Sequence, residues 1–389
     1  MLQTFKPVKA DPLLDLITAF AGDRRREKVD LGVGMYRDEN GRIPVMSAVR
    51  SAERRLAETQ PSKSYLGALG NLVFLDRVAD LVFGHALPDT GYRAAIQTTG
   101  GTAALRLAAD VIHAANPDAT IWLPEPAWGP HRPLFAHVGL RVEGIAFITP
   151  SNEHPDMEAL LDGLETARPG DAIILQVCCH NPTGISLTGN EWADLTDLIE
   201  QKQLLPVLDL AYQGLGDGLD DDASALRLMV GRVPEMLVTV SCSKTFALYR
   251  ERTGALFAVS NRSGVAKRVI DVAARAAGNL YYMPPDHGGA IVAEILGDAD
   301  LTRQWRTELD RMRERLLGLR GSFASSHPKL AFLARGRGMF ALLATEPERI
   351  CRLRAERGLY IAPDGRINIA GLRQADITHV ASLLAEAME

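Results

Sequence analysis

The sequence predicts an α/β fold whose main part is a mostly parallel sheet covered by helices on both faces. Short, nearly continuous apolar runs recur through the middle of the chain, and amphipathic stretches with helical periodicity separate several of them. The length of 389 residues is too great for one simple core, so we expect about two or three domains.

The apolar runs are the predicted strands, and the helices between them include residues 102–115 and 191–202. The predicted strands lie at residues 94–99, 120–125, 142–148, 172–179, 204–212, 235–242 and 254–260. Alternation of this kind is typical of a parallel sheet that is buried on both faces.

A smaller α/β unit is predicted near the C-terminus. A long helical stretch covers residues 298–326, short strands are expected at 339–345 and 366–371, and a helix at 376–388 closes the chain. The N-terminal region carries turn signals and little periodicity. We expect residues 1–45 to form an N-terminal arm and part of the small domain, 46–305 the large domain, and 306–389 the C-terminal small domain.

Composition excludes several classes of function. The net charge is −5 and no basic run dominates, so we expect no nucleic-acid partner. No run approaches the roughly 18 apolar residues of a membrane span, and a signal peptide is not evident. The four cysteines lie in or beside apolar runs without CxxC spacing, which favours buried reduced thiols and no metal site. These features predict a cytoplasmic protein.

Polar residues near the predicted strand ends are the candidates for a site, because open parallel sheets bind ligands beyond the C-terminal ends of their strands. Gly101 and Thr102 open a helix, and either a phosphate or a plain N-cap would explain them. Asn181 lies in a turn, "HNPTG", where it could donate to an anionic oxygen. Asp209 lies within an apolar strand, where a charge is costly unless it is paired; a structural salt bridge is the alternative.

A lysine follows the strand 235–242. Lys244 lies among Ser241, Ser243 and Thr245, and a desolvated amine near other cations has a lowered pKa and becomes nucleophilic. Arg252 is a suitable phosphate clamp. An amine, a buried carboxylate, the phenol of Tyr212 and a phosphate cradle are together what pyridoxal phosphate requires.

Along almost its whole length the sequence resembles the class I aspartate/aromatic aminotransferases, which are fold-type I pyridoxal-phosphate enzymes. The matching segments include "VDLGVGMYRDENGRIPV", "SYLGALG", "QTTGGTAALRLAAD", "EPAWGPH", "CCHNPTG", "LDLAYQGL", "SCSKTFALYRERTGA", "MPPDHG" and "GRINIAG". The resemblance implies an enzyme that passes an α-amino group to a 2-oxo acid in two half-reactions.

The resemblance also implies roles for individual residues. Lys244 would form the Schiff base with the cofactor and move protons at the substrate Cα. Asp209, supported by His131, would pair with the ring nitrogen, Tyr212 and Asn181 would bond the ring oxygen, and Trp128 would stack on the ring. The phosphate would be held by Gly101, Thr102, Ser241, Ser243 and Arg252, together with Tyr65 of a neighbouring subunit, which makes the expected unit a homodimer with shared active sites.

For the substrate, the resemblance implies that Arg366 clamps the α-carboxylate, helped by Asn181 and the backbone at Gly34, with Phe340 lining that site. Relatives that act on aspartate use a second arginine for the side-chain carboxylate. The corresponding position ahead of the double proline is Gly278 here, and Arg275 lies about one helical turn earlier.

This departure predicts a substrate without a side-chain carboxylate. The segment with Tyr281, Tyr282 and Met283 favours an aromatic or neutral side chain, whereas Asp15 or Asp217 could favour a cationic one. An aspartate or aromatic aminotransferase in which Arg275 or another cation replaces the missing arginine is the alternative. A different pyridoxal-phosphate reaction, such as elimination or decarboxylation, is a second alternative. A non-catalytic binding module would lack Lys244 or carry an added DNA-binding domain.

Overall fold

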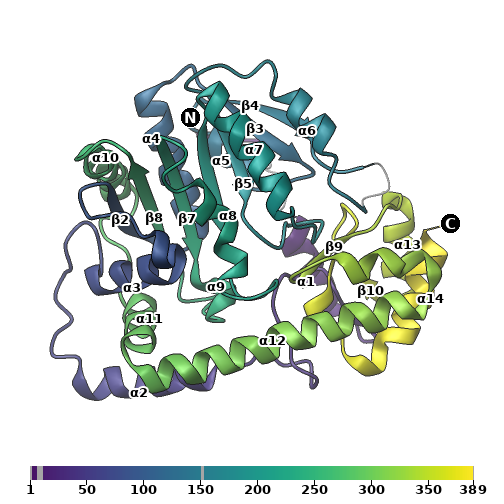
Figure 1. Ribbon diagram of the computed structural model, residues 1–389. Coiled ribbons are helices and arrows are strands. Elements are labelled where there is room, and N and C mark those ends of the chain that lie inside the picture. Colours follow the sequence, from purple (N-terminus) through teal and green to yellow (C-terminus); the bar gives the residue numbers. More distant parts are fainter. Residues whose placement is uncertain (1, 7–11, 150–152, 389) are drawn as a thin grey trace.

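The structure is a computed structural model that describes residues 2–6, 12–149 and 153–388 (Figure 1). A seven-stranded sheet forms its centre, in the order β2-β8-β7-β6-β5-β3-β4. Strand β8 runs antiparallel to both of its neighbours, and the other pairs are parallel. The strands are β2 (Arg93–Thr99), β3 (Thr120–Glu125), β4 (Arg141–Ala146), β5 (Ala172–Gln176), β6 (Leu205–Leu210), β7 (Glu235–Ser241) and β8 (Thr253–Ser260).

The prediction of a mostly parallel sheet covered on both faces is therefore confirmed. Side chains of β6 alternate between two apolar cores, with Val207 in one and Leu208 and Leu210 in the other. One core contains residues of α4 (Gly101–Ala115), α5 (His131–Ala136) and α10 (Val265–Leu280). The other contains residues of α2 (Ser47–Thr59), α3 (Leu72–Phe83), α7 (Gly189–Lys202), α8 (Ser224–Met229) and α11 (His287–Gly297).

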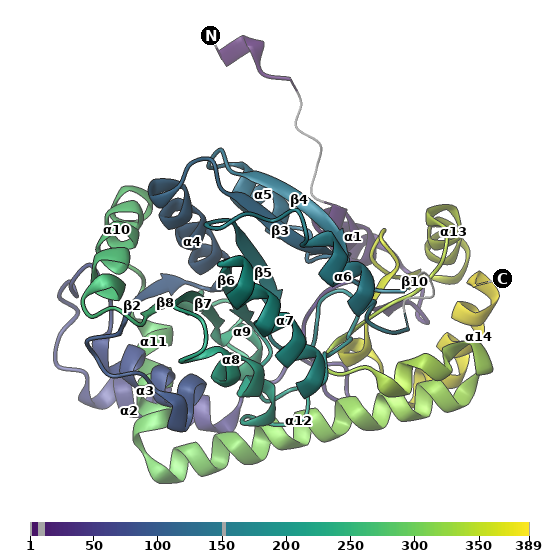
Figure 2. The same ribbon diagram turned by 45° about the horizontal axis from the view of Figure 1, so that its top comes forward.

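The long helix α12 (Ala299–Ser326) runs along one side of the molecule to the C-terminal unit (Figure 2). Its first part, from Leu301 to Leu316, packs into the core of the large sheet, and Leu319 and Phe323 belong to a third core. One helix therefore serves both units. The boundary between the large domain and the C-terminal small domain, expected at residues 305 and 306, stays a prediction.

The third core joins the N-terminal segment to the C-terminal unit, since it includes Leu31 beside residues of α14 (Ile377–Ala387). Strand β1 (Val29–Asp30) pairs with β10 (Leu359–Tyr360), and β9 (Phe340–Leu342) pairs with β11 (Arg366–Asn368). Two predicted strands are shorter than expected. The one at 366–371 ends at Asn368, whose side chain accepts the Ala370 N–H and starts a 3₁₀ turn. In the one predicted at 339–345, only residues 340–342 form a strand, β9, which pairs with β11.

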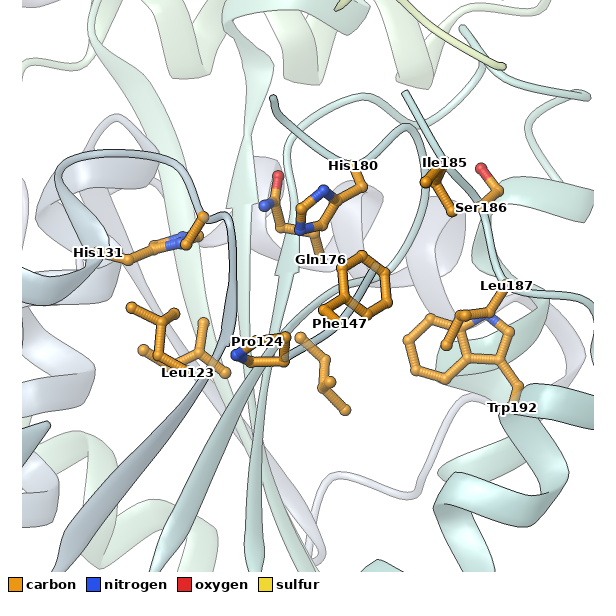
Figure 3. Close-up of a pocket in the computed structure, with 13 residues that line it drawn as sticks. Leu123, Pro124, His131, Phe147, Gln176, His180, Ile185, Ser186, Leu187 and Trp192 are labelled. Carbon is orange, nitrogen blue, oxygen red and sulfur yellow. The ribbon is translucent and has the colours of Figure 1, made fainter. Parts of the chain in front are cut away.

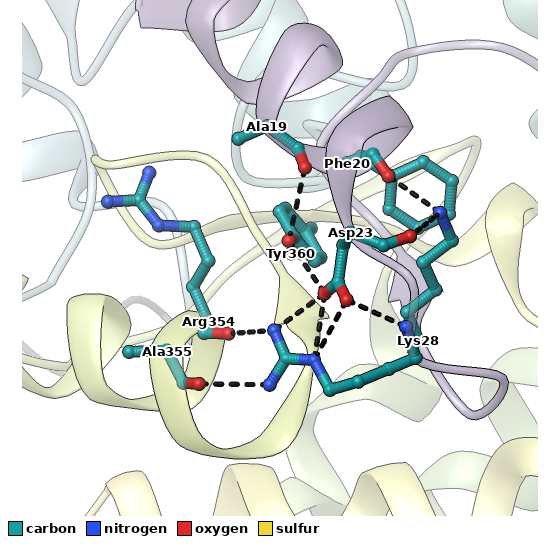
Figure 4. A network of polar contacts seen from close by, with 8 residues as sticks. Ala19, Phe20, Asp23, Lys28, Arg354, Ala355 and Tyr360 are labelled. Atoms are coloured by element: carbon teal, nitrogen blue, oxygen red, sulfur yellow. Dashed lines mark hydrogen bonds and ion pairs between the residues drawn. The ribbon is translucent and has the colours of Figure 1, made fainter.

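A polar network fixes the end of α1 (Pro12–Gly22) to this unit (Figure 4). The Asp23 carboxylate accepts hydrogen bonds from the Arg25 guanidinium at 2.6 and 2.8 Å and from the Tyr360 hydroxyl at 2.8 Å. The guanidinium also donates to the carbonyls of Arg354 and Ala355 in α13 (Pro347–Arg357), each at 2.9 Å. The N-terminal segment thus packs on the C-terminal unit.

None of the helices in the described ranges combines the length and apolarity needed to cross a membrane.

Candidate active site

A cavity opens at the C-terminal ends of β5, β6 and β7. It brings together most of the predicted site residues. Its lining consists of Gly34, Gly101, Thr102, Leu105, Trp128, Gln176, Asn181, Asp209, Ala211, Tyr212, Ser241, Ser243, Lys244, Tyr249 and Arg252. Segments that are far apart in the sequence therefore meet at the C-terminal ends of the central strands.

Lys244 lies in a one-turn helix, α9 (Cys242–Thr245), directly after β7. Ser241 caps this turn by accepting the Ser243 N–H. The Lys244 ammonium lies 4.9 Å from the centre of the Tyr212 ring. Burial lowers the pKa of Lys244 to about 8; the nearby Asp209 charge opposes this, and Arg252 and Arg366 add to it. An amine with this pKa is a nucleophile near neutral pH.

Asp209 is buried and is held by two neighbours. Its Oδ2 lies 3.1 Å from Nε2 of His131, and its Oδ1 accepts a hydrogen bond from the Thr239 hydroxyl at 3.1 Å. Thr239 is the residue paired with Asp209 on β7. No lysine or arginine of the described ranges forms an ion pair with Asp209, so the geometry gives no support to a purely structural salt bridge.

A smaller, mostly apolar cavity is lined by His131, which contacts Asp209, and by His180 (Figure 3). Nδ1 of His180 lies 2.9 Å from the Thr183 hydroxyl. Burial, and secondarily the charge of His131, lowers the pKa of His180 to about 3, so this imidazole is neutral near pH 7. The other nitrogen of His131, Nδ1, is buried and has no hydrogen-bond partner among the described residues. The imidazole also meets the Trp128 ring edge-on at 5.2 Å between ring centres, so His131 is held between Trp128 and Asp209.

The opposite end of the main cavity is rich in donors. Helix α4 begins at Gly101 and Thr102, so the N–H groups of its first turn face this end. Gly100 has φ +83, and a Cβ there would lie 2.7 Å from the Arg252 guanidinium. Arg252 donates to the Ser243 hydroxyl at 3.4 Å. Backbone N–H groups, hydroxyls and an arginine that pairs with no acidic side chain of the described residues suit a phosphate.

Arg366 lies on β11 at the edge of the cavity. It donates to Oδ1 of Asn181 at 3.3 Å and to the Gly32 carbonyl at 3.0 Å, while its buried Nε has no partner. The Asn181 amide in turn donates to the Tyr212 hydroxyl at 3.2 Å. Among the described residues no acidic side chain pairs with Arg366, so its charge is available to an anionic ligand.

Phe340 covers this arginine, with its ring centre 4.6 Å from Cζ of Arg366. The same ring meets the edge of Tyr212 at 6.0 Å between ring centres. A Cβ at Gly34 would lie 2.8 Å from the Phe340 ring, so only glycine allows this approach. The predicted group of Gly34, Asn181, Phe340 and Arg366 is thus brought together.

Other predicted residues lie outside the cavity. Tyr65 is 83% exposed, and Asp15 is exposed on α1, whose Leu16 packs against Gly32. Asp217 forms an ion pair with Arg337 at 2.6 Å. This pairing weakens Asp217 as a candidate acceptor for a cationic substrate.

Gly278 is exposed on α10, and a Cβ there would meet no atom within 4 Å. The helix is continuous from Arg275 to Leu280, so Arg275 stays about one turn farther back. Beyond the helix, Tyr282 has φ +66, is 72% exposed and meets the ring of Tyr65 edge-on at 6.1 Å. The two tyrosines form an exposed aromatic pair.

Sequence reasoning missed Gln176, Thr239 and Tyr249. Gln176 exchanges two hydrogen bonds of 2.9 Å with the backbone of Asn181, which fixes the turn that carries that residue. The Tyr249 hydroxyl accepts the Tyr36 N–H at 3.0 Å, and burial raises the pKa of Tyr249 to about 12. Gln176 offered a usable signal, because it is the one polar residue inside the predicted apolar run 172–179.

Comparison with known proteins agrees with this geometry. The sequence profile described as "Aminotransferase class I and II" matches residues 26–384. A tyrosine aminotransferase of Rhizobium meliloti is 47% identical over 95% of this chain and 96% of its own length. An aromatic-amino-acid aminotransferase of Pseudomonas aeruginosa is 42% identical over 97% of each chain, and the Escherichia coli aspartate aminotransferase is 37% identical over 96% of each.

A solved aromatic amino acid aminotransferase with 3-indolebutyric acid superposes with a TM-score of 0.96, at 38% identity over the whole of both chains. An aromatic-amino-acid aminotransferase from Burkholderia pseudomallei, covalently bound to pyridoxal phosphate, has the same TM-score at 34% identity over both full chains. The cavity fits that cofactor, with a lysine beside Asp209 and donors at the far end. This chain belongs to the class I and II aminotransferases and is a pyridoxal-phosphate-dependent enzyme that acts on amino and 2-oxo acids.

Proposed function

We propose that this aminotransferase acts on an amino acid without a side-chain carboxylate, and that an aromatic side chain fits best. The observation that carries the proposal is Gly278, an exposed helical position without a side chain where the resemblance calls for an arginine. A bidentate, charge-assisted contact of that kind contributes about 2–4 kcal/mol when it is buried. Relatives named tyrosine and aromatic-amino-acid aminotransferases support the aromatic choice.

We assign the cofactor roles as the resemblance implies. Pyridoxal phosphate, when bound, supplies an aldehyde for the amino group and a ring that takes up electrons from Cα. Asp209, held by His131 and Thr239, would keep a proton at the ring nitrogen, and Lys244 would carry the proton to and from Cα. Trp128 would cover the ring, and Tyr212 and Asn181 would bond the ring oxygen. The phosphate would lie against Gly101, Thr102, Ser241, Ser243 and Arg252.

The substrate α-carboxylate would be held by Arg366 and Asn181, with Phe340 and the backbone at Gly34 closing the site. The unpartnered Nε of Arg366 supports this role. An arginine presents a fork of donors that matches both oxygens of a carboxylate.

We also propose a homodimer in which Tyr65, and beside it Tyr282, enter the neighbouring subunit's site. Two exposed tyrosines in edge-on contact, one with positive φ, are costly on a free surface and support an intermolecular role. The cytoplasmic location stays a prediction from the sequence.

A cationic side chain is the second candidate for the substrate. The exposed Asp15 carboxylate, on a helix that packs against Gly32 at the edge of the site, favours it. No basic side chain of the described residues pairs with Asp15. An aspartate enzyme that relies on Arg275 is the third candidate.

Single half-reactions separate these candidates. The holoenzyme is mixed with one amino acid at a time, and loss of the visible absorbance of the bound cofactor gives kcat/KM for each donor. We expect tyrosine or phenylalanine to react faster than aspartate and arginine. Faster reaction of arginine would favour the Asp15 candidate, and efficient reaction of aspartate would contradict the argument from Gly278. Absence of any change with every amino acid would contradict transamination itself.

A further inference from the structure

Arg320, on the C-terminal half of α12, is a buried arginine that pairs with no carboxylate of the described residues. Its side chain is 1% exposed, and it forms no ion pair within the described parts of the chain. Burial lowers the pKa of this guanidinium to about 10, so it stays charged near neutral pH. A buried charge without an acidic partner is costly and calls for a specific explanation.

The hydrogen bonds that the Arg320 guanidinium forms with the described residues all go to main-chain carbonyls of one segment, residues 333–340. Its Nε donates to Gly338 at 3.2 Å, Nη1 donates to Leu333 at 3.2 Å, and Nη2 donates to Arg337 at 3.0 Å and to Phe340. The planar fork of an arginine can hold these diverging acceptors at once, which the single ammonium of a lysine cannot. Arg320 therefore sets the path of the chain into β9.

Two glycines make room for this side chain. A Cβ at Gly336 would collide with Nη1, and a Cβ at Gly184 would lie 2.7 Å from Nη2 and collide with the Phe340 carbonyl. Gly184 ends the turn that carries Asn181, and its carbonyl accepts the Arg337 N–H at 2.7 Å. Arg320 thus lies at the junction of two segments, one from the large sheet and one from the small unit.

Each of these segments carries part of the carboxylate site. Phe340 follows the junction on one side, contacts the Arg366 guanidinium with its ring and pairs with Asn368 on the strand of Arg366. Asn181 lies on the other side and accepts a hydrogen bond from Arg366. A shift of the 333–340 segment would therefore change the distance between Arg366 and Asn181.

We propose that Arg320 is a positioning residue for recognition of the substrate α-carboxylate: by joining the Phe340 segment to the Gly184 turn, it holds Arg366 and Asn181 in register. The inference rests on the proposed role of Arg366 and Asn181. Arg320 touches neither substrate nor cofactor in this scheme, and its effect is transmitted by Phe340 and the Gly184 turn.

Two probes that differ in a carboxylate test the inference. Aminooxyacetate and O-methylhydroxylamine both react with the bound cofactor, but only the first has a carboxylate. The ratio of their second-order rate constants, followed by absorbance, measures carboxylate recognition alone. In Arg320→Met we expect this ratio to fall by about ten- to hundredfold, with a smaller fall in Arg320→Lys, because small displacements of binding groups have large effects.

Arg315→Lys is the matched control. Arg315 lies on the same helix and donates to Glu39 and to the Leu372 carbonyl, away from the 333–340 segment. We expect this variant to keep the wild-type ratio. The bound-cofactor spectrum and the reaction with O-methylhydroxylamine should be unchanged in all three variants. If Arg320→Met does not fold, the same ratio measured on Arg320→Lys decides.

An unchanged ratio in a folded Arg320 variant would overturn the inference, as would equal losses with both probes, which indicate general disorder. Arg366→Met separates the inference from the proposal on which it rests. If the ratio of the two rate constants falls in Arg366→Met but stays at the wild-type value in the Arg320 variants, only the positioning role fails. If Arg366→Met also keeps it, the proposed carboxylate site is wrong.

Discussion

At the scale of single residues, the environment of Lys244 determines when its amine can react. The pKa of about 8, against 10.5 for an ordinary lysine, means that the amine becomes neutral as the pH rises through 8. Only the neutral amine attacks an aldehyde. We therefore expect the rate of covalent attachment of pyridoxal phosphate to the apoprotein to rise up to about pH 8 and then level off.

Stopped-flow absorbance of the apoprotein mixed with pyridoxal phosphate measures this profile. Lys244→Ala is the control and should show no covalent attachment at any pH. A rate that keeps rising towards the ordinary lysine pKa of 10.5 would show that burial does not shift the pKa of Lys244 in this way.

Single substitutions can separate the contribution of the Asp209 charge from that of the hydrogen bond that Thr239 donates to it. Asp209→Asn keeps the shape of the side chain but removes the charge that would hold the ring proton, so we expect kcat to fall about hundredfold or more. Thr239→Val removes only one hydrogen bond to the same carboxylate, so a loss of about tenfold or less is expected. The rate of the half-reaction at saturating substrate measures the loss in each variant. Equal losses in Asp209→Asn and Thr239→Val would show that the placement of the Asp209 side chain matters and its charge does not.

At the scale of elements, the central strands such as β5, β6 and β7 were predictable because each is a nearly continuous apolar run buried between two cores. The site residues predicted from the strand ends, such as Asp209 and Lys244, meet in the cavity for the same reason. Contacts between distant segments were not predictable. Arg320 and Tyr249 act through partners that are close only in the folded chain. The end of β11 was also missed, because the capping side chain of Asn368 overrides the apolar pattern after it.

Helix α10 carries the clearest test of substrate choice. Gly278→Arg places a guanidinium where a Cβ meets no neighbour, so folding should be unaffected or slightly improved. We expect kcat/KM for aspartate to rise by at least about tenfold relative to that for phenylalanine, because a charge-assisted contact is gained. Asn279→Arg, the next position on the same exposed turn, is the matched control and should leave the ratio unchanged. Equal gains in both variants would indicate a general effect of positive charge.

At the scale of the whole molecule, the proposed sharing of sites between two subunits has a measurable consequence. If Tyr65 acts in the neighbouring subunit, each site needs Lys244 from one chain and Tyr65 from the other. Lys244→Ala alone should be inactive, and Tyr65→Ala alone should bind the cofactor about tenfold more weakly, because it loses a hydrogen bond to a charged group. The two variants carry complementary defects.

Mixing these two variants in equal amounts under conditions that let subunits exchange should therefore restore activity. Half of the dimers become hybrids in which one site has both native residues, so about a quarter of the wild-type sites return. Activity at limiting pyridoxal phosphate, compared with the unmixed variants, measures the gain. A control mixture of Lys244→Ala with Arg252→Ala should give no such site, since both residues line the same cavity in one chain. If the Tyr65 mixture also gains nothing, although sedimentation shows that hybrids have formed, Tyr65 does not act across the interface.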